Sequence, residues 1–173
     1  MATVAMLGSA SAAFAGTYPV HITDPAGDAI YAGVLNDNNA DLLAVDANLS
    51  TSSLTLTDTV AAVLSSSSID YAVEVTRYGP NNGTQLLSIV TANAATLQVS
   101  DAGGLRSVKV TGTATYDTAR GTVAAVYSRA AINAALARYH KAPLALTDQV
   151  SLSASAADHL KGATDSASDQ GGF

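Results

Sequence analysis

The feature that most constrains this chain is a pair of alternating segments joined by a short polar turn, within residues 105–129. Between 108 and 116 the even-numbered positions hold Val, Val, Gly, Ala and Tyr, whereas the odd-numbered positions hold Lys and Thr. A period of two is typical of a strand with one buried and one solvated face. The turn at 117–121 ends in Gly121, which can adopt a positive φ, and the pattern resumes over 122–127. The sequence therefore predicts a β-hairpin here.

Similar short segments recur at intervals of about 8 to 12 residues, with turns between them, which is typical of sandwiches and barrels. We therefore predict an all-β protein, an antiparallel β-sandwich of about eight to ten strands. The other predicted strands cover 16–22, 43–49, 54–60, 69–77, 86–91, 96–99 and one or two strands from 144 to 152. The predicted core includes Val45, Leu54, Leu56, Val73, Val75, Val110 and Val123.

Three features depart from this pattern. Residues 129–140 carry apolar side chains at helical spacing and are followed by Pro143, so one short helix is predicted there. Asp58 falls on the apolar face of its strand, which we interpret as a β-bulge that turns the carboxylate outward, or alternatively as an edge where it reaches water. Residues 158–173 are polar and rich in Gly and Ser, so this end is expected to fray.

Length and composition narrow the class of protein. A chain of 173 residues is expected to form one domain, here residues 16–173. Cysteine is absent, which excludes disulfides and thiolate metal sites. The net charge of −6 and the scattered Lys and Arg argue against nucleic-acid binding. No apolar run reaches the length of a transmembrane helix.

The first fifteen residues are apolar and end in Ala13-Phe14-Ala15, which resembles a signal-peptidase site. A positive segment before them is missing. Two interpretations stay open: a truncated signal peptide, or an apolar segment that belongs to the mature protein. With the low charge and high Ser and Thr content, the pattern favours a secreted, extracellular protein.

The loop after the first predicted strand, 23–28, is the best candidate for a metal site. Asp24 and Asp28 are separated by Pro, Ala and Gly, so the two carboxylates can fold around one ion, and Asp41 in the next polar loop can add oxygen ligands. Calcium prefers six to eight such hard oxygen ligands. The alternative is a plain turn in which the Asp side chains bind backbone amides.

Four stretches occur in a familiar order: ITDPAGDA, DLLAVDANLSTSSLTLT, VTGTATYDTARGTVAAVYSRAAI and ATDSA. Together they resemble secreted β-sandwich modules of the carbohydrate-binding-module-9/DOMON type, which are accessory domains of extracellular proteins such as subtilisin-like proteases. The resemblance covers roughly residues 16 to 168. It departs from the family at Tyr127-Ser128, where a valine-proline pair is expected before Arg129.

The resemblance implies a non-enzymatic module that binds a glycan or haem, carries structural calcium, or has no known ligand. It also pairs Asp165 with the acidic loop, which adds Asp165 to the expected metal ligands Asp24, Asp28 and Asp41.

Catalytic patterns are missing: no nucleophile elbow, no paired His at metal spacing and no marked pair of carboxylates occurs. Glycan sites stack sugars on aromatic rings, and the loop-placed candidates for such contacts are Tyr31 and Tyr78. We therefore expect a secreted accessory, binding or adhesion module, with a glycan or cell-surface ligand as partner. The alternative is a self-associating subunit of an extracellular filament or coat, in which residues 1–15 add as a strand to a neighbouring subunit.

Overall fold

The structure is a computed structural model and describes residues 17–31, 34–35, 38–78, 83–101 and 107–168. These residues form twelve strands and one helix: β1 (Val20–Thr23), β2 (Ile30–Tyr31), β3 (Val34–Leu35), β4 (Leu42–Leu49), β5 (Ser53–Val60), β6 (Ile69–Arg77), β7 (Thr84–Thr91), β8 (Ala94–Ser100), β9 (Ser107–Asp117), β10 (Thr122–Ser128), α1 (Arg129–Ala137), β11 (Val150–Asp158) and β12 (Ala163–Ser168). The described neighbours in the sheet pair antiparallel. The all-β prediction is confirmed.

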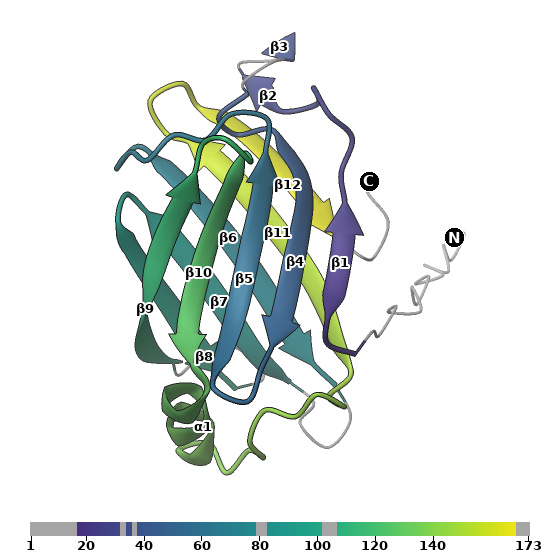
Figure 1. The fold of residues 1–173 in the computed structure, drawn as a ribbon, viewed down its shortest axis with the longest axis vertical. Coiled ribbons are helices and arrows are strands. Elements are labelled where there is room, and N and C mark those ends of the chain that lie inside the picture. Colours follow the sequence, from purple (N-terminus) through teal and green to yellow (C-terminus); the bar gives the residue numbers. More distant parts are fainter. Residues whose placement is uncertain (1–16, 32–33, 36–37, 79–82, 102–106, 169–173) are drawn as a thin grey trace, which may run out of the picture.

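The strands form one continuous sheet in the order β1-β4-β5-β10-β9-β8-β7-β6-β11-β12-β2-β3. The sheet bends so that β1, β4, β5, β10 and β9 form a front layer, with β6, β7, β11 and β12 behind it (Figure 1). Near its two ends the sheet almost meets itself, because β12 contacts β4 and β1 without pairing with either. The architecture is therefore a two-layered sheet that approaches a barrel, rather than two separate sheets.

The predicted hairpin is confirmed. Asp117 pairs with Thr122 and Thr113 with Val126, so β9 and β10 have the expected register. All seven predicted core residues are buried. Gly112 lies where the ring of Tyr127 crosses β9, and a Cβ at 112 would approach two ring carbons to 2.5 Å. The missing side chain at 112 therefore makes room for a large buried one at 127.

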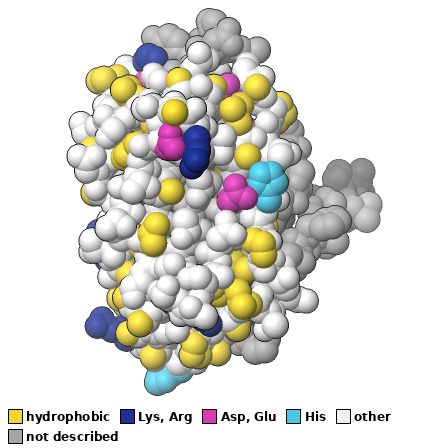
Figure 2. All heavy atoms as spheres, viewed as in Figure 1, with side chains coloured by type: hydrophobic (Ala, Val, Ile, Leu, Met, Phe, Trp, Pro, Cys, Tyr) yellow, Lys and Arg dark blue, Asp and Glu magenta, His cyan; other side chains and the backbone are white. Residues whose placement is uncertain are grey.

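The outer face of the front layer carries many threonines and few charges. Lys109, Thr111, Thr113 and Thr115 of β9 are exposed, as the alternation predicts. Figure 2 shows this face of the molecule, on which charged side chains are few and scattered. Threonine suits this position because its branched side chain favours extended backbone while its hydroxyl stays in water.

Helix α1 lies across one end of the layers, as predicted for residues 129–140 (Figure 1). Its N-cap is Ser128, whose side chain accepts a hydrogen bond from the Ala131 amide. The helix buries Ile132, Ala135 and Leu136 against the core. Most other positions of the helix are alanines, whose small side chains expose little apolar surface. The three buried residues are therefore enough for this short helix to cover the end of the two layers.

Two predictions at the C-terminal side are wrong. Residues 163–168, expected to fray, form β12, which pairs with β11 and buries Ala163 and Ala167. The prediction failed because the small Ala and Ser side chains give only a weak hydrophobic pattern. The strand is stabilised by its hydrogen bonds to β11 and by the two buried alanines. The predicted strand from 144 to 152 begins only at Val150.

Residues 142–148, which precede β11, are held in place by hydrogen bonds from a buried arginine rather than by pairing with a strand. Arg77, at the end of β6, donates from Nε and Nη2 to Oδ2 of Asp148 at 3.0 and 2.7 Å. It also donates to the carbonyls of Ala142 and Pro143 at 3.1 and 3.0 Å. The two side chains are 0 % and 8 % exposed, so the ion pair lies out of water.

Candidate metal centre at the acidic loop

The acidic loop follows β1 and is fixed to the start of β4 by backbone hydrogen bonds. The Asp24 amide donates to the Leu43 carbonyl at 2.9 Å. Gly27, with a φ of 85°, turns its amide onto both carboxylate oxygens of Asp41 at 2.9 and 3.0 Å. A side chain at 27 would be strained at this φ, which explains the glycine there. The loop is therefore held on both sides of its turn.

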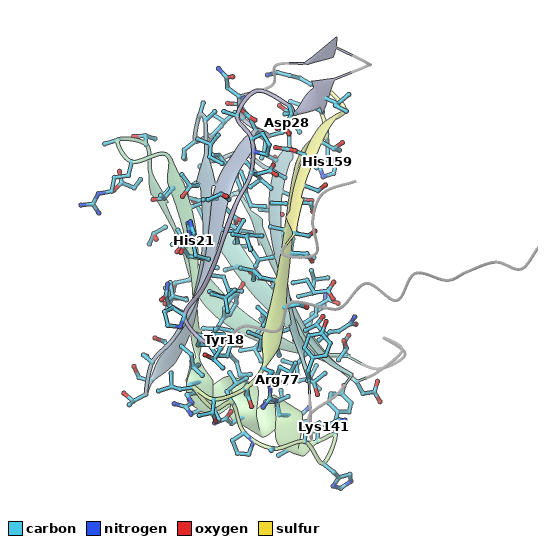
Figure 3. All side chains as sticks on the ribbon, turned by 90° about the vertical axis from the view of Figure 1, so that its right-hand side faces the viewer. Tyr18, His21, Asp28, Arg77, Lys141 and His159 are labelled. Atoms are coloured by element: carbon cyan, nitrogen blue, oxygen red, sulfur yellow. The ribbon has the colours of Figure 1, made fainter. Side chains whose placement is uncertain are left out.

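Three of the predicted ligands come together at this loop. One carboxylate oxygen each from Asp24, Asp28 and Asp165 lies within 4.8 Å of the other two. Asp28 lies at the end of the molecule opposite Arg77 and α1, as Figure 3 shows. Asp165 lies on β12 and points toward the loop. Its oxygens accept hydrogen bonds from the amides of Leu42 at 2.8 Å and Ser166 at 2.7 Å. The sheet therefore joins two carboxylates of one loop to a third from a distant strand.

The carboxylates of this acidic cluster destabilise one another's charged forms. The pKa of Asp24 is raised to about 6, first by burial, then by the charges of Asp165 and Asp28. The pKa of Asp165 is raised by burial, although the hydrogen bonds from the Leu42 and Ser166 amides oppose this effect. Nearby negative charges and partial burial both favour protonation or a bound cation.

Two oxygens of the cluster are available as ligands. Oδ2 of Asp24 and Oδ1 of Asp28 are buried and accept no hydrogen bond from the described residues. Buried carboxylate oxygens are normally satisfied, so these two fit a group outside the chain. Hard oxygen donors in a loop match the preference of calcium, with backbone carbonyls or waters completing its shell.

The acidic cluster borders a cavity of about 910 Å³. Its lining includes the three carboxylates, Glu74 of β6, Ser155 of β11, and Ser166 and Ser168 of β12. These side chains offer hydroxyl and carboxylate oxygens, so the cavity is suited to polar ligands.

Asp41 and Tyr78, two other predicted site residues, are not part of the cluster. Asp41 is buried, and its carboxylate accepts hydrogen bonds from the Gly27 amide, so it fixes the backbone of the acidic loop. Tyr78 follows Arg77 at the opposite end, and its hydroxyl lies 2.9 Å from Ser151 Oγ. The side chain of Tyr31 lies outside the described part of the structure. The expected contact of these two tyrosines with a glycan therefore stays a prediction.

Asp58 is a feature that sequence reasoning misread. The predicted bulge at Asp58 and the alternative of an edge where it reaches water are both wrong: the residue pairs regularly with Val45 and Val123 and is only 2 % exposed. The irregularity lies instead in β4, between Leu42 and Ala44. As a result the carboxylate stays on the inner face, where the strict alternation of β5 had put it.

Comparison with protein-family models, curated proteins and solved structures finds no match. The resemblance to the carbohydrate-binding-module-9/DOMON type therefore stays a prediction. In the described ranges of the chain, no helix has the length and apolar character needed to cross a membrane.

Proposed function

We propose that this chain is an exported, non-enzymatic binding or accessory module whose fold is stabilised by calcium. The observation that carries the proposal is the convergence of Asp24, Asp28 and Asp165, with two buried oxygens that lack a hydrogen-bond partner among the described residues. A bound cation turns the mutual repulsion of these carboxylates into attraction and ties β12 to the loop after β1. Its role is structural, because it joins two ends of the sheet that do not pair with each other.

The partner that suits the neighbouring cavity is a polyhydroxylated ligand such as a glycan. Serine hydroxyls of β11 and β12 and the carboxylate of Glu74 on β6 supply hydrogen-bond partners next to the acidic cluster. Recognition would depend on hydrogen bonds rather than on ring stacking, since the described lining contains no aromatic side chain.

Thermal unfolding in excess calcium and in chelator tests the calcium part of this proposal. Free calcium at about one hundred times its dissociation constant stabilises the folded state by about 2.7 kcal/mol. For a chain of this length we expect the melting temperature to rise by roughly 5 to 10 °C. Asp28→Asn should remove the rise, whereas Asp46→Asn, which neutralises an exposed carboxylate paired with His21, should keep it. An unchanged melting temperature of the parent in chelator would refute the site.

The second candidate is the self-associating subunit, and one observation favours it. The outer edge of β1 and the edge of β12 at 165–168 have no strand partner among the described residues. Both edges nevertheless carry features that oppose pairing. β1 has four residues and lies between Pro19 and Pro25, and Asp165 puts a charge on the side of β12 that buries its alanines. Short edges, prolines and inward charges protect sheets from one another, which favours the binding module.

Light scattering over a range of protein concentrations separates the two candidates. A monomer throughout supports the binding module, whereas concentration-dependent growth supports the filament. Mass spectrometry of the exported protein should accompany it, because the filament requires residues 1–15 to be present.

A further inference from the structure

Asp58 lies at the centre of the inner face of β5. The strand turns Leu54, Leu56, Asp58 and Val60 inward, and all four are buried. Val123 of β10 pairs with Asp58 on one side and Val45 of β4 on the other. Oδ1 of Asp58 has no hydrogen-bond partner among the described residues. An ionised carboxylate in such a place loses its hydration without compensation, so the neutral form is preferred.

Within the described part of the chain, the groups that face Asp58 provide no compensating positive charge. From β10, Tyr127 faces it, with its hydroxyl 2.7 Å from Ser88 Oγ. From β6, Tyr71 faces it and donates to the carbonyls of Asn39 and Leu64. Val45 and Val123 on the neighbouring strands are apolar, and Asp158 of β11 adds only negative charge near Tyr71. The buried cation Arg77 is bound to Asp148 and two carbonyls near α1.

Burial is the cause of the altered acidity of this carboxyl. It raises the pKa of Asp58 from 3.8 to about 8. In an unfolded chain the same group would be ionised above about pH 4. The folded protein therefore holds a proton at neutral pH that the unfolded protein does not.

The β4–β5 ladder has a weak point close to this carboxyl. The register shifts between Leu42 and Ala44, opposite Val60 and Thr59, and Thr59 is the residue next to Asp58. Beyond the shift, the Leu42 amide is held by the Asp165 side chain rather than by a neighbouring strand. A strand pair interrupted at one residue opens there at a lower cost than in a regular ladder.

We propose that Asp58 is a proton-binding switch: the folded sheet holds its carboxyl protonated, and loss of that proton opens the β4–β5 ladder at the neighbouring register shift. The switch makes this an acid-stable domain that loosens above neutral pH. Since the opening segment carries Leu42, which binds Asp165, the same event disturbs the acidic cluster. The inference does not rest on calcium binding, because Asp58 takes no part in that cluster.

The sign of the effect follows from linkage. A group whose pKa is higher in the folded state contributes its full stability below the unfolded value of about 4 and loses it as pH rises toward 8. Over that range the folding equilibrium constant falls by about tenfold per pH unit for one extra bound proton. Above about pH 8 both states are ionised and the dependence ends.

Urea unfolding across this pH range, with chelator in every sample, tests the proposal. Asp58→Asn removes the titration, and Asp58→Val matches the neighbouring Val45 and Val123 if the buried amide prevents folding. We expect the parent to lose stability with rising pH faster than either variant, by about one bound proton. Asp46→Asn, which removes an exposed carboxylate, should retain the parent's dependence. Equal pH dependence in the parent and the Asp58 variants would overturn the proposal.

Amide hydrogen exchange at a fixed pH of about 8 tests where the opening occurs. Compared with Asp58→Val, the parent should exchange faster at residues 42–45 and 58–60, with β6 and β7 unchanged. A uniform increase over all strands would show global unfolding in place of the local opening, and would overturn that part of the inference.

Discussion

Removing Asp148 should leave Arg77 as a buried, unpaired cation. The Asp148→Ala change deletes both hydrogen bonds from the guanidinium to Oδ2 and the bond from the Ala145 amide to the same atom. Arg77 keeps two carbonyl acceptors, from Ala142 and Pro143, but neither carries a charge. Because the arginine side chain is fully buried, water cannot replace the lost carboxylate without opening the loop.

The expected cost is about 3–5 kcal/mol, the range for breaking one side of a buried ion pair. In a chain of this length each kcal/mol lowers the melting temperature by about 2–4 °C, so the drop should be roughly 6–20 °C. Replacing both partners, as in Arg77→Met with Asp148→Ala, should recover much of the loss because no buried charge remains. The recovery would show that the cost comes from the unpaired charge.

Calorimetry or circular dichroism of the parent, the two single variants and the double variant measures this cycle. A matched control is Arg120→Ala at the exposed pair with Asp117, where the charged atoms are 3.7 Å apart and the side chains are 82 % and 43 % exposed. It should cost well under about 1 kcal/mol. If Asp148→Ala costs no more than this control, the buried pair does not hold residues 142–148 as described.

Two further results are expected. Gly112→Ala should destabilise the fold by about 1–3 kcal/mol in urea unfolding, because the new Cβ would meet the Tyr127 ring at 2.5 Å and the Val126 carbonyl oxygen at 2.7 Å; an unchanged midpoint would contradict this packing. The calcium-dependent rise in melting temperature should shrink as pH falls through about 6, because the raised pKa of Asp24 makes protons compete with the ion and protonation relieves the repulsion in its absence; a rise of the same size at pH 5 would contradict that competition.

The alternation of apolar and polar residues predicted most of the longer strands, the hairpin and the core, and the helical spacing of apolar residues predicted α1, because these features depend on local periodicity. It missed β12, whose small Ala and Ser side chains give a weak pattern. It could not predict that Arg77 is buried, since that depends on Asp148 from a segment that folds back against the end of β6. The alternation in the sequence placed Asp58 on the buried face of its strand. We nevertheless predicted that it points outward, because charged side chains normally avoid apolar interiors. The pattern was right, because a protonated carboxyl needs no counter-ion.

The acidic cluster was partly predictable. Asp24 and Asp28 are neighbours in the chain and were expected to act together. Asp165 was expected only through the family resemblance, and nothing in the sequence distinguished Asp165, which completes the cluster, from Asp41, which binds the loop backbone. This choice depends on how β12 approaches the start of β4, a contact between residues far apart in the chain.

The order of strands in the sheet also has a consequence for the folding pathway. Residues 69–117 form β6 to β9, in which each strand pairs with the one before it, so these hairpins can form early. The pairing of β5 with β10 can form only after the segment between these two strands has been synthesised. β11 then returns to the free side of β6. Because the β5–β10 and β6–β11 pairs join segments that are distant in the chain, the domain should fold slowly. We expect β6 to β9 to form the folding nucleus and the contact between β1 and β12 to form last.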